Sequence, residues 1–387
     1  MDQLKFLFWL LLAILFYTYI GYALIVIVNN LFKKHSFKRS DLQDWMEVTF
    51  VVASYNEEKI LTQKIENTLS LNYPSGKLKF IVVTDGSDDG SVNIVKQYQQ
   101  QVFLLHSPER RGKAAAMNHA MQHVQTSIVI FSDANCLLNK DSVQHMMKHF
   151  IGDKVGAVAG EKKITRSTGF GSAEGWYWKY ESWMKKMDAA LYSVVGASGE
   201  LFAMRTNLFE PLDENTLLDD FMLSAYVCLQ GYVIAYEPKA YAVEFPSASL
   251  YDEQNRKVRI AAGAFQALSK INFQTLIKQP LLLAFQFFSR RWLRWVVCPF
   301  AIIAVFVLNA SLSALPGKDI YDYFFITQII FYIAAVLGAL LMRHNKTFIL
   351  TTIPFYFLFM NFCMLQGLLL FLQKKQTVLW PKTERVT

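Results

Sequence analysis

The sequence predicts an α/β domain, with a mostly parallel sheet covered by helices on both faces, that is flanked by transmembrane helices. Three observations support this class. Apolar β-rich runs alternate with helical patterns over residues 48–132, long charge-free stretches lie towards both ends of the chain, and polar clusters follow the predicted strands. Strands that alternate with helices favour a parallel sheet, because each crossover helix covers a face of that sheet.

The first predicted element is a retained transmembrane helix, residues 1–32. No charged residue falls between Lys5 and Lys33, and the stretch Phe6–Phe32 is longer than the apolar part of a signal peptide. About 20 apolar residues span a bilayer, and no small-residue cleavage site follows this stretch. We therefore expect the helix to remain in the protein as a membrane anchor.

Basic residues directly after this helix indicate the side of the next domain, residues 33–275. They are Lys33, Lys34, Lys38 and Arg39. The positive-inside rule then predicts a cytoplasmic domain in a multi-pass protein of the plasma (inner) membrane. The net charge of +8 suits anionic lipid and anionic substrates equally well, so it does not choose between them.

Within this domain we predict four strands and the helices that connect them. The strands are Val48–Ala53, Leu78–Thr84, Val102–His106 and Ser127–Ser132, and the helices are Ile60–Leu71, Val92–Gln100 and Lys113–His123. In sheets of this kind, ligands bind beyond the carboxyl ends of the strands. The polar residues that follow the strands are therefore the candidates for a site.

The C-terminal part predicts an interfacial amphipathic helix at residues 276–294, three transmembrane helices within 295–373 and a basic tail at 374–387. The three charge-free stretches are Trp295–Gly317, Tyr323–Met342 and Thr347–Gln373, and arginines alternate with tryptophans just before them. Three crossings would place the tail outside, although Lys374, Lys375, Lys382 and Arg385 favour the inside. Either one span is re-entrant, or residues 281–295 contain another crossing.

Cysteine usage predicts neither disulfides nor a zinc site. Cys136, Cys228, Cys298 and Cys363 show no paired spacing, and two of them lie in predicted spans. This fits a reducing cytoplasm.

Four polar clusters lie at ends of the predicted strands and helices. They are Ser54-Tyr55-Asn56-Glu57, Asp85-Gly86, Arg110-Arg111-Gly112-Lys113 and Asp133-Ala134-Asn135. Basic groups beside a helix N-terminus suit a diphosphate, and oxygen ligands suit Mg²⁺ or Mn²⁺. Each cluster alone is equally typical of a helix cap, a strand-end turn or a solvated basic turn.

Three later groups complete the pattern. Ser198-Gly199 follows a small-residue run, Asp219-Asp220 begins an apolar helical stretch, and Arg256 and Arg259 lie three residues apart on one helix face. Of two adjacent carboxylates, one can have a raised pKa and serve as a general base, or both can simply favour a helix N-terminus. Membrane-surface contact competes for the two arginines.

In their order along residues 48–270, these clusters resemble the motifs of the family 2 glycosyltransferases, in particular the membrane-integrated branch with the poly-N-acetylglucosamine, hyaluronan and cellulose synthases. The resemblance implies a GT-A fold and an inverting transfer from a nucleotide-sugar donor, taken as a UDP-sugar, to a membrane-associated glycan acceptor in cell-surface polysaccharide synthesis. The alternative is a non-processive polyprenyl-phosphate monoglycosyltransferase. Neither needs a nucleic acid, and the oligomeric state stays open.

The resemblance also assigns roles to residues. It implies catalysis by Asp220 with Asp219, metal binding by Asp133 and Asn135, acceptor binding by Ser198 and Gly199, and donor binding by Ser54, Tyr55, Glu57, Asp85, Lys113, Asp133, Arg256 and Arg259. Four positions depart from the family pattern: Asn135 replaces Asp, Asp219 replaces Glu, and Arg256 and Ile260 replace Gln and Trp. Because that Trp stacks on the acceptor in processive synthases, processivity is not implied.

Overall fold

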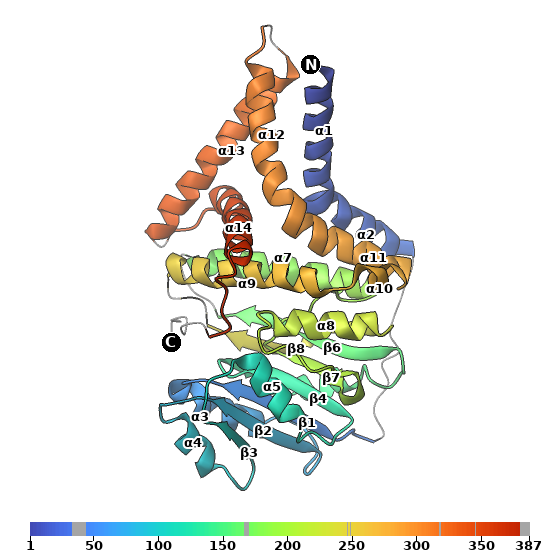
Figure 1. The fold of residues 1–387 in the computed structure, drawn as a ribbon, viewed down its shortest axis with the longest axis vertical. Helices are drawn as coiled ribbons and strands as arrows, with labels where there is room; N and C mark the ends of the chain where they lie inside the picture. The colour runs from blue at the N-terminus through green and yellow to red at the C-terminus, as the bar shows by residue number, and fades with distance from the viewer. Residues whose placement is uncertain are drawn as a thin grey trace.

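The computed structural model describes residues 1–32, 44–165, 170–245, 247, 249–316, 319–344 and 346–379. The basic residues at 33–39, together with Lys382 and Arg385, lie outside the described residues. Figure 1 shows a sheet domain at one end, a layer of long helices above it, and a bundle of apolar helices at the other end.

An 8-stranded sheet in the order β3-β2-β1-β4-β7-β6-β8-β5 forms the domain. Strands β1 (Val48–Ser54), β2 (Leu78–Asp85), β3 (Phe103–Ser107) and β4 (Ile128–Asp133) are parallel. Strand β6 (Val155–Ile164) is parallel to β8 (Val233–Glu244), whereas β7 (Phe202–Arg205) and β5 (Cys136–Leu138) run antiparallel to their neighbours. The predicted α/β class is confirmed, with a mixed second half.

Both faces of the sheet are buried, which explains the nearly continuous apolar strands. On β1, Phe50 and Val52 belong to one core and Val51 to the other. Helices α3 (Glu58–Leu69), α4 (Ser91–Gln97) and α6 (Ser142–Met147) cover the first face, and α5 (Lys113–Met121) and α8 (Asp219–Leu229) cover the second. Helices α7 (Phe170–Leu191) and α9 (Leu250–Lys270) form the layer between sheet and bundle, with the short α10 (Phe273–Ile277) after α9.

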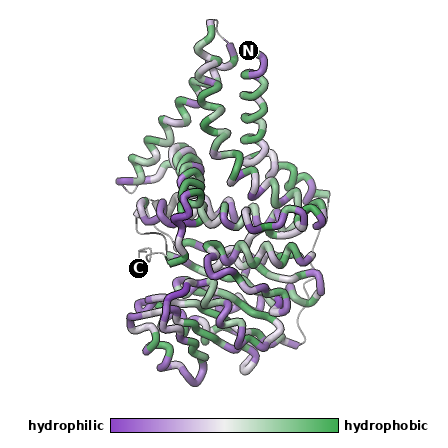
Figure 2. The backbone as a smooth tube through the Cα atoms, in the orientation of Figure 1, coloured by the Kyte–Doolittle hydropathy of each residue, from purple (hydrophilic) through white to green (hydrophobic). Residues whose placement is uncertain are grey.

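Within the described residues, four helices are long and apolar enough to cross a membrane: Asp2–Phe32, Leu281–Ser313, Ile320–Arg343 and Ile349–Leu372. The first combines α1 (Asp2–Phe16) and α2 (Tyr22–Phe32), and the last two are α13 and α14. Figure 2 shows that hydrophobic residues dominate these helices. The chain thus has the apolar helices that its charge-free stretches predicted.

The segment predicted as a separate interfacial helix continues directly into the next span. Helix α11 (Leu281–Phe287), a π-helical segment (Phe288–Val297) and α12 (Cys298–Ser313) follow one another without a break. Two of its arginines face the domain, because Arg290 pairs with Asp188 at 3.0 Å and Arg294 pairs with Glu181. The assignment of residues 276–294 to the membrane interface stays a prediction.

Helix α14 packs along α9 of the sheet domain. At Gly367, a Cβ atom would come within 2.4 Å of the Ala261 side chain, so glycine permits this close approach. A hydrogen bond also joins the two helices, since the Gln254 side chain of α9 donates to Gln366 of α14 at 2.9 Å. After α14 the chain returns to the sheet domain, where Val378 lies against Gly112 (Figure 1). The C-terminal segment and the sheet domain therefore lie on the same side of the helical bundle.

Candidate active site

A lysine at the start of α5 links carboxylates from two other elements. The Lys113 ammonium contacts Asp133 Oδ1 at 2.7 Å, at the end of β4, and Asp219 Oδ2 at 2.8 Å, at the start of α8. The apolar strand β4 fixes Asp133 beyond its carboxyl end, and the backbone of α8 begins at the paired aspartates. Three motifs far apart in the sequence thus converge on one point.

Gly199 lies at the centre of this cluster. A Cβ atom there would come 3.1 Å from Lys113 Nζ and 3.6 Å from both Asp133 Oδ1 and Asp220 Oδ2. A side chain would fill the space between the ammonium and the two carboxylates. Glycine therefore keeps that space open, and the acceptor role of Ser198 and Gly199 stays a prediction.

The two adjacent aspartates differ in their surroundings. Asp219 is held by Lys113, whereas Asp220 accepts the backbone N–H of Phe221 on Oδ1 at 2.7 Å. In the described part of the chain, Asp220 Oδ2 has no hydrogen-bond donor, and it faces Gly199. Burial first, and then the nearby Asp219, raise the pKa of Asp220 to about 7. A carboxylate with this pKa is suited to accept a proton near neutral pH.

Lys113 is held in its charged form by the same cluster. Burial alone would lower the pKa of Lys113, but Asp133, Asp219 and Asp220 raise it well above its ordinary value. The ammonium is therefore a fixed positive charge at the N-terminus of α5. Such a charge is placed to attract a diphosphate, since helix N-termini also favour anions.

Asp85 holds the loop that leads into α5. Its carboxylate accepts the backbone N–H of Arg111 at 2.9 Å and that of Gly112 at 2.7 Å, and Asp85 is buried. Next to it, Gly86 adopts φ +64°, and the following loop passes so close that a Cβ atom there would meet the Arg110 nitrogen at 2.5 Å. Asp85 thus has a structural role that its motif did not indicate, and its predicted contact with the donor stays a prediction.

The predicted donor residues of the first motif lie beside this loop. The Arg110 guanidinium stacks on the Tyr55 ring at 3.6 Å, and the Glu57 backbone N–H donates to Ser91 Oγ at 3.0 Å. Ser54 is buried at the end of β1, and its hydroxyl has no partner among the described residues. Tyr55 therefore presents an aromatic face, already covered by a cation, at the carboxyl edge of the sheet.

The structure places Arg256 in a buried ion-pair cluster. Its guanidinium contacts Glu253 at 2.7 Å and Glu244 at 4.0 Å. Neutralisation of a donor diphosphate by Arg256 would require it to leave these carboxylates, so the predicted role needs a rearrangement. Arg259 is partly exposed on the same helix, α9, and its donor role stays a prediction.

The predicted metal ligands supply only part of a coordination shell. Asp133 and Asn135 are both partly exposed on either side of the buried Ala134, at the turn that ends β4, and offer a carboxylate and an amide oxygen. No group of three or more His, Cys, Asp or Glu side chains suited to a metal exists within the described ranges. The residues fit a hard cation only if substrate phosphates complete its ligands.

Charged residues behind the site were missed by the sequence reasoning. Lys162 of β6 pairs with both Glu200 and Glu244, and Glu200 directly follows Gly199. Glu200 also helps to raise the pKa of Asp220, after burial and Asp219. The charged run Glu161-Lys162-Lys163 at the end of an otherwise apolar strand was a signal in the sequence, but it does not reveal the partners of Lys162.

Comparisons with known proteins show what the chain is similar to in sequence and in fold. A family model described as "Glycosyl transferase family 2" matches residues 49–212. The poly-beta-1,6-N-acetyl-D-glucosamine synthase of Staphylococcus aureus (strain COL) is 26% identical over 237 residues, 59% of this chain and 57% of the relative. That of Staphylococcus epidermidis is 23% identical over 279 residues, 69% and 67% of the two chains. The match thus spans little more than half the length of the first of these relatives.

Among solved structures, a mannosyltransferase of Pyrobaculum calidifontis, PcManGT, in complex with GDP-Man and Mn²⁺ matches with a TM-score of 0.72 and 20% identity. The match covers 95% of this chain and 99% of the other. The two chains therefore share one fold over almost their whole length.

Proposed function

Because residues 49–212 form a glycosyltransferase family 2 domain, we propose that the protein is a membrane-bound glycosyltransferase that moves a sugar, with inversion, from a nucleotide-sugar donor to a membrane-associated acceptor. One observation carries this proposal: Lys113, Asp133, Asp219 and Asp220 converge around the space that Gly199 leaves open. Lys113, which can balance the charge of a leaving diphosphate, and Asp220, a base of raised pKa, then both border the space at Gly199.

The transfer follows from these positions. An acceptor hydroxyl oxygen attacks the anomeric carbon while its proton passes to Asp220 Oδ2. The bond from that carbon to the phosphate oxygen breaks, and its electron pair leaves with the nucleotide diphosphate, whose charge Lys113 balances. Asp133 and Asn135 would hold Mg²⁺ or Mn²⁺, which would neutralise diphosphate charge.

For the donor, we propose a UDP-sugar, and for the product, cell-surface polysaccharide. The support is likeness in sequence to synthases whose name specifies an N-acetylglucosamine polymer. The structure of the mannosyltransferase was solved with GDP-Man, so a GDP-sugar is the alternative donor. Tyr55, with Arg110 stacked on it, provides the aromatic surface against which either base would lie.

The activity should appear with one class of nucleotide sugar and should require a divalent cation. Purified protein is incubated with UDP- and GDP-sugars in turn, and the released nucleotide diphosphate is measured with Mg²⁺, with Mn²⁺ and with excess chelator. We expect nucleotide release with a UDP-sugar, and we expect this release to stop in excess chelator, because Asp133 and Asn135 hold the cation that neutralises the diphosphate.

Asp133→Asn should raise the metal concentration needed for activity at least tenfold, whereas Asp141→Asn, in an exposed turn, should not.

Full turnover in excess chelator would show that the reaction needs no divalent cation at Asp133 and Asn135. If the folded protein released nucleotide diphosphate from none of the nucleotide sugars, the proposed function itself would be refuted.

The position of the C-terminal segment makes a topology prediction. Single cysteines at Lys140 and Lys375 should both be protected from an impermeant thiol reagent in intact cells, because the segment after α14 rests on the cytoplasmic domain. A cysteine at Ala314, at the far end of α12, should react and serves as the control. The native cysteines are buried, which limits background labelling. Labelling at Lys375 but not at Lys140 would show that α14 crosses the membrane.

A further inference from the structure

A fully buried lysine lies directly behind the turn that carries the predicted metal ligands. Lys64 of α3 is 0% exposed, and its ammonium donates to Ser132 Oγ at 2.7 Å and to the Cys136 carbonyl oxygen at 2.9 Å. Cys136 Sγ, at 3.6 Å, is a third acceptor, so each of the three N–H groups has one. Ser132 directly precedes and Cys136 directly follows Asp133-Ala134-Asn135. One amine thus holds both ends of this turn.

The position of Lys64 is unfavourable for a charged group. A lysine is almost never fully buried unless it is paired, and no carboxylate lies within 4.0 Å of Lys64 among the residues that the structure describes. Burial lowers the pKa of Lys64, while Cys136 and then Asp133 partly offset this effect. An apolar side chain of the same length would avoid the desolvation of the ammonium. The lysine therefore contributes more than packing, and its hydrogen bonds in the described part of the chain all go to the two flanks of the turn.

The same hydrogen-bond network reaches the loop around Gly199. Ser132 Oγ accepts from Lys64 and donates to the Glu200 carbonyl oxygen at 2.7 Å. Cys136 Sγ lies 3.3 Å from the same oxygen as a second donor. Because Glu200 directly follows Gly199, the network joins the metal turn to the loop that borders the reacting space.

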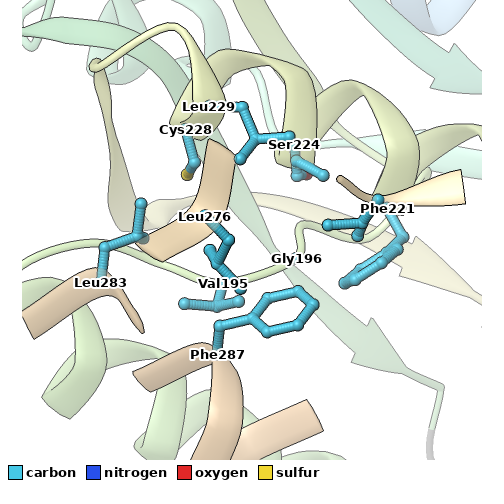
Figure 3. Close-up of a pocket in the computed structure, with 11 residues that line it drawn as sticks. Val195, Gly196, Phe221, Ser224, Cys228, Leu229, Leu276, Leu283 and Phe287 are labelled. Carbon is cyan, nitrogen blue, oxygen red and sulfur yellow. The ribbon is translucent and has the colours of Figure 1, made fainter. Parts of the chain in front are cut away.

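The other end of this loop is held by apolar packing. Gly196 lines an apolar pocket together with Phe221 of α8 and Phe287 of α11 (Figure 3). Gly199 lies three residues beyond this pocket and one residue before the polar anchor at Glu200. Loss of the polar anchor would therefore move Gly199 before it disturbed the pocket.

We propose that Lys64 is a positioning residue for sugar transfer, which holds the turn of Asp133 and Asn135 and the Gly199 loop in register, so that a cation on the donor diphosphate meets both ligands. This inference rests on the proposed function and adds to it a residue that contacts neither substrate nor cation. The amine takes no part in bond making. Residues that orient metal ligands from behind typically contribute roughly 10–100-fold to metal affinity.

The test measures Mn²⁺ binding to the purified full-length protein in lipid nanodiscs by electron paramagnetic resonance, in the presence of whichever of UDP and GDP the wild-type protein binds. Lys64→Met keeps the length of the side chain and removes its hydrogen-bond donors, so the dissociation constant for Mn²⁺ should rise at least tenfold. Binding of the nucleotide in excess chelator, measured by calorimetry, should stay nearly unchanged, because the hydrogen bonds of Lys64 end at the metal turn.

Ser132→Ala is the second variant, and it leaves Lys64 in place. It removes the hydroxyl group that links Lys64 to the Glu200 carbonyl oxygen, which should raise the dissociation constant for Mn²⁺ about fivefold, the usual effect of one hydrogen bond. The double variant should bind Mn²⁺ at most about twofold more weakly than Lys64→Met alone, because the two side chains act through the same contact.

Asn67→Ala is the matched control. Asn67 lies one turn beyond Lys64 on the same face of α3, and its side chain bonds the backbone N–H of Leu138 at 2.7 Å and its carbonyl oxygen at 2.9 Å, beyond the metal turn. This variant should lower the melting temperature, as Lys64→Met does, but should keep the wild-type affinity for Mn²⁺.

Equal weakening of Mn²⁺ binding in Asn67→Ala would mean that α3 only stabilises the domain, and it would overturn the inference. Wild-type affinity for Mn²⁺ in folded Lys64→Met, or in Ser132→Ala where Lys64→Met does not fold, would overturn it as well. If the wild-type protein bound neither UDP nor GDP, the result would count against the proposed function, and this inference would be lost with it.

Discussion

Replacing Asp220 by Asn is expected to lower the turnover of sugar transfer by at least ~100-fold, the lower bound for losing a general base. The amide keeps the size of the side chain and can still accept the N–H of Phe221, but it cannot take a proton from the acceptor. Binding of the nucleotide diphosphate, measured by calorimetry, should stay nearly unchanged, because Lys113 still pairs with Asp133.

Asp219→Asn is the matched comparison for this variant. Asp219 contacts Lys113 at 2.8 Å, so its carboxylate is already engaged by a cation. Its amide can still accept one hydrogen bond from that lysine, and the loss in turnover should therefore be smaller. Near-normal turnover of Asp220→Asn would reduce the carboxylate to a favourable charge at a helix start, and the base would have to be another residue.

Much of this site was predictable because its parts are local. A strand that ends in Asp133, a loop that ends in Lys113 and a helix that begins at Asp219 each follow from a short run of residues. In a parallel sheet the carboxyl ends of strands share one edge, so the order of motifs already places them together. The family match confirms the domain that this order indicated.

What the sequence did not predict are pairings between distant residues. Arg256 was expected at a diphosphate, but it contacts Glu244, from the end of β8, and Glu253. Arg290 belongs to the segment predicted as an interfacial helix, and the sequence did not indicate that it pairs with Asp188 of α7. A charged side chain looks the same in a sequence whether solvent, lipid or a buried partner balances it. Only the packing of α7 and α9 on the sheet decides which applies.

Asp85 shows a related limit. The motif after β2 indicated a ligand for the donor, and a turn with a helix cap was the alternative. In the structure the carboxylate accepts backbone N–H groups from Arg111 and Gly112, and so fixes the loop that carries Lys113, while its contact with the donor stays a prediction. A contact of this kind joins residues that lie 26 and 27 positions apart, so no local pattern reveals it.

The same loop supports the second large prediction, Gly86→Ala. A methyl group at Gly86 would lie 2.5 Å from the Arg110 backbone nitrogen and 2.7 Å from its Cα, and a backbone cannot yield as a flexible side chain does. The loop would have to move away from Asp85 and would displace Lys113 at its end. Because a misplacement of about 1 Å can cost ~100-fold in rate, we expect turnover to fall by about that factor and binding of the nucleotide diphosphate to weaken at least tenfold.

Gly76→Ala separates this clash from backbone strain. Gly76 also adopts a positive φ, +78° against +64° at Gly86, but nothing lies within 4 Å of its added Cβ. Both variants should lose roughly 1–2 kcal/mol of stability from the left-handed conformation. The melting temperature of Gly86→Ala should fall further, because its added Cβ also meets the Arg110 backbone. Only Gly86→Ala should also lose nucleotide binding. If the two variants bound the nucleotide diphosphate equally well, the Arg110–Gly112 loop would not be part of the donor site, and Lys113 would have to reach the diphosphate without it.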